Sequence, residues 1–174
     1  IVNHPDASTF YQNSIYMLGW SQFKQELYNP ALDSFISLLD HRFDKEGPGA
    51  NIDPATQQQL SDVLRVMSWI FSEQGGSTAV ATLLNKTGQK SYEHLLYSRL
   101  ATEYLAKSRY MDTATTYQAY IGKYPNNSYS AIYSGLKVDA YLAGSFLALA
   151  FDEKVSFVKQ YGFLLSERDS QSEP

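Results

Sequence analysis

The sequence predicts an all-α protein whose helices form about four antiparallel pairs. Apolar residues recur at helical spacing, and no segment sustains the alternation of a strand. Proline, glycine and capping residues divide the chain into eight helical runs. The 174 residues are 44% hydrophobic and 18% charged, which is typical of a folded domain. We therefore expect a single helical domain over residues 1–174.

The first helix pair is predicted over residues 9–43, after an extended segment at 1–7. Apolar residues on one face indicate the first helix, and a break near Glu26 separates it from the second. Residues 44–52, with the sequence DKEGPGANI, form a predicted loop because the GPG triplet cannot continue a helix.

The second pair is predicted over residues 53–86. Asp53 followed by proline is typical of a helix start, because the carboxylate caps the helix and proline is tolerated in the first turn. We expect Gly75 and Gly76 to end this helix, and Ser77 to cap a shorter one.

The last two pairs are predicted over residues 91–124 and 128–162. Ser128 is expected to cap the seventh helix. The eighth helix is expected to begin after Gly144 and to end at Gly162. Residues 166–174 are polar and are predicted to form a disordered tail.

An internal repeat relates the four pairs. A 34-residue frame can be started at Gln12, Ser61, His94 and near Ser128. The eighth position of each frame holds a small residue, where a large side chain would push two crossing helices apart. The gap between the first two copies is longer because it contains the GPG loop. The small residues are Gly19, Ser68, Ala101 and Gly135.

With this pattern the chain resembles the tetratricopeptide repeat (TPR) family over most of residues 10–162. The stretches YMLGWSQFKQELYNPALDSFISLLD, SDVLRVMSWIFSEQGG and YSRLATEYLAKSRYMDTATTYQAYIGKYP are similar to parts of large repeat proteins of the Gram-negative envelope. The resemblance implies a right-handed α-α superhelix, a TPR-like solenoid whose concave face acts as a scaffold for a protein or peptide. It also implies a periplasmic or outer-membrane-associated location. We expect the chain to be a fragment of a longer array.

In this family the first helix of each pair lines the concave face. Both tryptophans of the chain occupy the same position of the frame, and aromatic residues and arginine concentrate energy at binding surfaces. Whether Trp20 and Trp69 face a groove or pack internally is left open, as is whether the 44–52 loop fills that groove. The resemblance implies these partner-binding residues: Asn13, Tyr16, Trp20, Phe23, Lys24, Arg65 and Trp69.

Other functions find little support in the sequence. The net charge of −4 argues against nucleic acid as the main ligand. The chain has no cysteine, its three histidines are far apart, and no phosphate-binding glycine motif is present. We therefore expect no enzyme activity, no metal site and no cofactor. The alternative to partner binding is a structural spacer within a longer envelope array, with no dedicated ligand.

Overall fold

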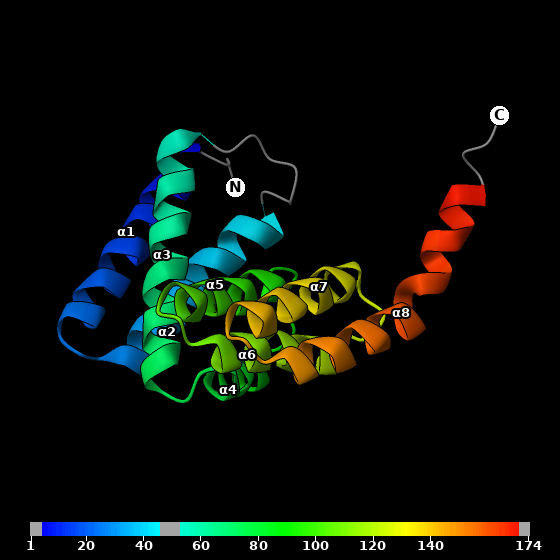
Figure 1. Ribbon diagram of the computed structural model, residues 1–174. Coiled ribbons are helices and arrows are strands. Elements are labelled where there is room, and N and C mark those ends of the chain that lie inside the picture. Colours follow the sequence, from blue (N-terminus) through cyan, green and yellow to red (C-terminus); the bar gives the residue numbers. More distant parts are fainter. Residues whose placement is uncertain (1–4, 46–52, 171–174) are drawn as a thin grey trace.

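The computed structural model describes residues 5–45 and 53–170, with side chains over 10–43 and 53–162. In these residues the chain forms eight α-helices and no strand (Figure 1), so the predicted all-α class is confirmed. The helices are α1 (Pro5–Lys24), α2 (Tyr28–Asp40) with a π-helical extension η1 (His41–Lys45), α3 (Pro54–Glu73), α4 (Ser77–Thr87), α5 (Glu93–Ala106), α6 (Tyr110–Lys123), α7 (Ser128–Ala143) and α8 (Leu147–Ser170).

The helices pack mainly against their neighbours in sequence, with one exception. Extensive contacts join α1 to α2, and α5, α6, α7 and α8 in succession. Helix α3 instead packs mainly against α5, and α4 makes only limited contacts with α3, α5 and α6. In Figure 1, α5, α6 and α7 lie across the molecule, and the end of α8 leads away from it. The predicted pair α3–α4 is therefore looser than the other three.

Two of the three predicted helix caps are displaced by one residue. Asp53 caps α3 as expected, because its carboxylate accepts from the Thr56 backbone N–H at 3.1 Å. The residue preceding α4 is Gly76, whose φ of +67° suits glycine, so Ser77 is the first helical residue. Asn127 rather than Ser128 caps α7, since its side-chain oxygen accepts from the Tyr129 N–H at 2.9 Å.

Two ends of the chain are more helical than the sequence predicted. Helix α1 begins at Pro5, because proline is tolerated in a first turn whose N–H groups have no helical partner. Helix α8 continues through Gly162 to Ser170, so residues 166–170 are helical where a disordered tail was predicted. A single glycine costs a helix only about 1 kcal/mol, which does not force it to end. Residues 171–174 and most of the 44–52 loop lie outside the described part.

Small residues lie where the helices of a pair cross. A Cβ on Gly19 would come within 2.5 Å of the Phe35 ring, so the two helices cross closely where a small residue was predicted. In the third copy, the Thr113 hydroxyl lies 3.0 Å from the Arg109 carbonyl and 3.3 Å from the Ala101 carbonyl, and either oxygen can accept its proton. Thr113 and Ala101 are both fully buried, so small residues meet where α5 and α6 cross.

The fourth copy of the repeat begins three residues later than predicted. A Cβ on Gly135 would meet nothing within 4 Å, so Gly135 is not at a close crossing. In the first three copies one backbone hydrogen bond closes the turn between the two helices, and it joins frame positions 16 and 11: Leu27 to Gln22, Gly76 to Phe71 and Arg109 to Tyr104. Its counterpart runs from Phe146 to Tyr141, so the frame of the fourth copy starts at Ala131.

Candidate functional site

Three aromatic residues of α1 share one face of the helix. Tyr16, Trp20 and Phe23 are spaced by four and three residues, which places them on the same side of a helix. The ring centroids of Tyr16 and Trp20 are 6.2 Å apart, and those of Trp20 and Phe23 are 5.8 Å apart. All three side chains are half-buried against the core.

The second tryptophan joins this cluster from α3. The ring of Trp69 meets Phe23 edge-to-face, with centroids 5.5 Å apart and an interplanar angle of 84°. The ring of Tyr28, at the start of α2, is 5.5 Å from Trp69 and 6.1 Å from Phe23, measured between centroids. Edge-to-face pairs are favourable because the positive edge of one ring meets the negative face of the other. The two tryptophans are therefore joined through Phe23.

A pocket of about 290 Å³ opens between these aromatic residues and α5. One cation and one anion line it. Arg65 pairs with Asp62 at 3.3 Å, and its side chain is about half exposed. Glu103, from α5, pairs with Lys107 at 3.0 Å. The complete lining is Trp20, Phe23, Arg65, Val66, Trp69 and Glu103.

The indole nitrogen of Trp20 is buried and has no hydrogen-bond partner among the described residues. An indole N–H can only donate, and a buried donor left unpaired costs about 1–3 kcal/mol. The Trp20 ring also lines the pocket, but its nitrogen is closed to solvent.

The pocket unites four of the seven residues predicted to bind a partner: Trp20, Phe23, Arg65 and Trp69. Tyr16 contacts Trp20 but does not line the pocket. Asn13 lies elsewhere on α1, where its side-chain oxygen accepts from Gln59 of α3 at 3.4 Å. Lys24 is exposed at the last turn of α1 and does not line the pocket.

Sequence reasoning missed Glu103, Val66 and Tyr28 as part of this region. The sequence of α5 alone does not indicate that this helix approaches α3, so Glu103 could not be assigned to the site from its own helix. A signal was available in the frame, since Glu103 directly follows Thr102, which occupies the same frame position as the two tryptophans.

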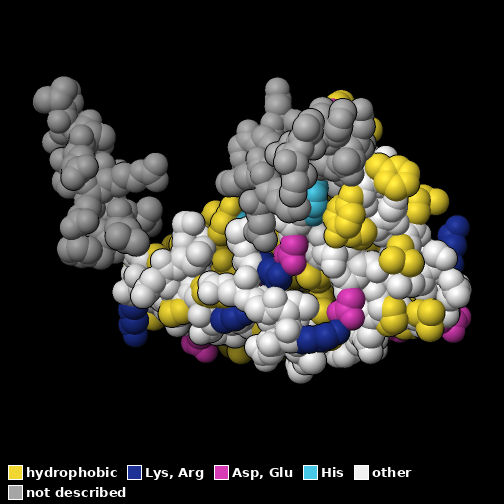
Figure 2. Space-filling view, turned by 180° about the vertical axis from the view of Figure 1, so that it is seen from behind, with side chains coloured by type: hydrophobic (Ala, Val, Ile, Leu, Met, Phe, Trp, Pro, Cys, Tyr) yellow, Lys and Arg dark blue, Asp and Glu magenta, His cyan; other side chains and the backbone are white. Residues whose placement is uncertain are grey.

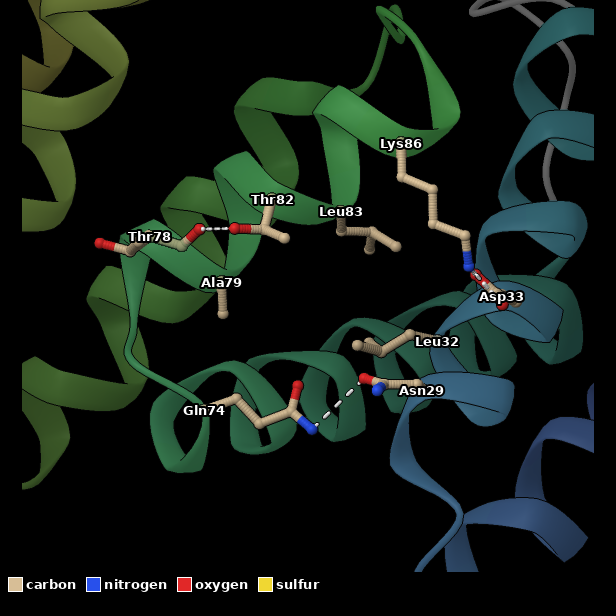
Figure 3. A pocket seen from close by; sticks show the side chains of 9 residues that line it. All are labelled: Asn29, Leu32, Asp33, Gln74, Thr78, Ala79, Thr82, Leu83 and Lys86. Carbon is tan, nitrogen blue, oxygen red and sulfur yellow. Dashed lines mark hydrogen bonds and ion pairs between the residues drawn. The ribbon is translucent and has the colours of Figure 1, made fainter.

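A second pocket, of about 300 Å³, lies between α2, α4 and the end of α3 (Figure 3). Its polar groups are largely paired with each other. Lys86 bonds both carboxylate oxygens of Asp33 at 2.8 Å, and the Gln74 amide donates to Asn29 at 3.5 Å (Figure 3). No aromatic ring lines this pocket, whereas three line the Trp20 pocket, which therefore suits an inserted apolar side chain better.

The described histidines lie apart from both pockets. The ring of His41 is hydrogen-bonded to Gln12 at 3.2 Å, and His94 stacks on Tyr129 with centroids 3.9 Å apart. Burial lowers the pKa of His94. Over the described side chains, no three acidic or histidine groups converge as a metal site would require, and no described helix is long and apolar enough to span a bilayer. His4 lies outside the described residues.

Comparison of this chain with protein-family models, with curated proteins and with solved structures finds no match.

Proposed function

We propose that this chain is a protein-interaction module of the TPR type, whose helix pairs stack into a right-handed superhelix. The close crossing at Gly19 and the buried contact of Thr113 with Ala101 support this, because both lie at the frame positions where such pairs need small residues. The packing of α3 on α5 also supports it, since the first helices of successive pairs are neighbours in a solenoid.

The partner is a protein or peptide segment that enters the pocket between Trp20, Trp69 and α5. The observation that carries this proposal is the cavity itself, which is lined by the aromatic rings of Trp20, Phe23 and Trp69. An apolar side chain of a peptide would fill the space between these rings. Arg65 and Glu103 at the edge would select the charges that flank the inserted side chain.

The proposed role is binding rather than catalysis, and it requires no metal or cofactor. The envelope location, and any association with outer-membrane or periplasmic assemblies, rest on the sequence resemblance and stay predictions.

The alternative is a spacer section of a repeat array with no dedicated ligand. The half-buried packing of Trp20, Phe23 and Trp69 on the core favours it, because side chains that already cover each other need no partner.

The two functions can be separated by selecting peptides from a displayed random library on the whole chain. Affinities of the selected peptides would then be measured for the wild type and for Trp20→Phe and Arg65→Ala variants. Trp20→Phe keeps an aromatic ring but shortens this wall of the pocket, and the lost contact should weaken binding roughly 3- to 10-fold. Asn85→Ala, on the exposed face of α4, is the control and should bind like the wild type.

Two results would favour the spacer over the binding module. One is a library that yields no peptide above background. The other is a set of peptides whose affinity is the same for all variants. Thermal melts of each variant would show that a loss of binding is not a loss of fold.

A further inference from the structure

A third pocket, of about 290 Å³, lies where the turn between α3 and α4 meets α5 and α6. We call it the Tyr104 pocket. Its lining consists of hydroxyl-bearing, glycine and charged residues, with no aliphatic side chain among them. It shares no residue with the Trp20 pocket. The composition of its lining therefore suits a polar ligand.

The start of α4 presents backbone donors to this pocket. The first N–H groups of a helix have no partner inside it, and no described side chain caps α4. The carbonyl of Gly76 accepts from Ala79 and Val80. The N–H groups of Ser77 and Thr78, which line the pocket, are left without an acceptor among the described residues. The positive end of the helix dipole also favours an anion at this place.

The hydroxyl of Tyr104 reaches the same place from α5. Tyr104 is only 3% exposed, and its hydroxyl oxygen lies 2.7 Å from the position that a Cβ on Gly76 would take. Among the described residues this hydroxyl has no hydrogen-bond partner. Burial raises the pKa of Tyr104, so the hydroxyl keeps its proton and can donate it. A buried tyrosine usually has a partner for its hydroxyl, and here the free donor faces the pocket.

Arg109 brings a positive charge to the edge of the pocket. Its guanidinium carbon lies 4.2 Å from the centre of the Tyr104 ring, and its Nε donates to Asp112 at 2.7 Å. The two terminal nitrogens of Arg109 have no partner among the described residues, so they can bind a ligand. Among the coloured atoms of the face in Figure 2, acidic and basic side chains are interspersed and form no basic patch. An anion would therefore have to be held by local donors such as these.

We propose that the Tyr104 pocket binds a phosphate group, either inorganic phosphate or the phosphate of an ester. Three kinds of donor meet there: the N–H groups that begin α4, the hydroxyl from α5 and the guanidinium that precedes α6. A tetrahedral phosphate offers acceptors in several directions at once, whereas a carboxylate offers them in one plane. This inference does not rest on the Trp20 pocket or on the proposed peptide partner.

The test is an NMR titration of the whole chain with inorganic phosphate, with sodium chloride added to keep the ionic strength constant. The amide signals of Ser77 and Thr78 should shift and saturate, because these N–H groups would donate to the phosphate. Glycerol phosphate, as an ester, and acetate, as a planar anion, are titrated in the same way. Saturation by inorganic phosphate or by the ester supports the proposal and identifies the source. Acetate should bind more weakly than whichever phosphate compound binds.

Two variants remove donors from the pocket. Tyr104→Phe keeps the ring beneath Arg109 but removes the hydroxyl, and Arg109→Gln removes the charge. Each should weaken phosphate binding about 10-fold, because each removes a hydrogen bond to a charged group. Tyr117→Phe changes a buried tyrosine outside the pocket, and Lys86→Gln removes an exposed cation in the last turn of α4. These matched controls should bind phosphate like the wild type.

A third variant should bind more tightly than the wild type. Asp112→Asn removes a negative charge from the pocket, while its side-chain oxygen can still accept from the Nε of Arg109. Phosphate binding should strengthen roughly 3- to 10-fold, because a like charge beside the anion is gone. A gain in affinity cannot result from unfolding, and melting curves show whether the other variants fold.

Four results would overturn the proposal. The first is that the Ser77 and Thr78 signals respond to neither phosphate compound beyond their response to chloride. The second is that acetate binds as tightly as phosphate. The third is that folded Tyr104→Phe and Arg109→Gln bind like the wild type. The fourth is that Asp112→Asn brings no gain in affinity.

Discussion

At the scale of single residues, the clearest determinant of this fold is the absence of a side chain. Gly19 lies in the middle of α1, where glycine weakens a helix, yet its missing Cβ lets the ring of Phe35 lie against the backbone. Phe35 is fully buried and has no room to withdraw. The lost helix propensity is therefore offset by a close helix crossing.

Gly19→Ala should destabilise the protein by about 1–3 kcal/mol, because the new methyl group would overlap the Phe35 ring. Gly135→Ala is the matched control, since its Cβ would meet open space, and it should stabilise the protein by about 0.5–1 kcal/mol. Urea unfolding of both variants measures the difference. If both substitutions changed the free energy of unfolding equally, the crossing of α1 and α2 at Gly19 would not be tight.

Residue patterns in the sequence predicted part of the candidate site. Trp20 and Trp69 share a frame position, and the structure connects them through Phe23. The spacing within α1 is local, so the sequence could reveal it. The contributions of Tyr28 and Glu103 depend on which helices meet, and no local spacing encodes that.

At the scale of elements, polar caps and glycines determine most helix boundaries. Thr56 donates both its hydroxyl and its backbone N–H to the carboxylate of Asp53, at 2.5 and 3.1 Å. The sequence predicted this start because the cap and the proline point to the same boundary. It failed at the end of α8, where a lone glycine weakens the helix without ending it.

The hydroxyl of Thr56 is the main cause that lowers the pKa of Asp53, followed by the backbone N–H of the same residue. Because the pKa is lower in the fold, the charged cap stabilises the protein above the ordinary pKa of 3.8, and this contribution is lost as the pH falls through the folded value. Thr56→Val should therefore raise the Asp53 pKa measured by NMR titration. Asp53→Ala should lower the melting temperature at neutral pH, and Asp53→Asn, which keeps an acceptor, should lower it less. An Asp53 pKa unchanged in Thr56→Val would contradict this assignment.

At the scale of the whole molecule, helix pairs of similar sequence do not pack alike. The repeat frame predicts four equivalent pairs, yet α3 packs mainly on α5, and α4 is held more loosely. The frame specifies which residues are small or large, but it does not specify which helices meet. That α3 packs on α5 and leaves α4 loosely held could therefore not be read from the pattern.

The core that results is rich in tyrosine, and this should make the protein sensitive to alkaline pH. Burial raises the pKa of several core tyrosines, including Tyr97, Tyr117 and Tyr133. A raised pKa means that the folded state holds its protons more tightly than the unfolded state. The associated stability is fully present below the ordinary pKa of 10.0 and is lost as the pH rises through the folded values.

Two substitutions separate the titration of these tyrosines from their hydrogen bonds. Burial is the cause of the raised pKa of Tyr117, so Tyr117→Phe should reduce the loss of stability at alkaline pH and change stability little at neutral pH. Tyr133 also donates to the His94 carbonyl at 2.7 Å, so Tyr133→Phe should reduce the alkaline loss but cost about 0.5–1.5 kcal/mol at neutral pH. Urea unfolding at a series of pH values, with tyrosinate absorbance followed in parallel, measures both effects. If both variants lose stability above pH 10.0 as steeply as the wild type, buried tyrosines are not what limits the fold in alkali.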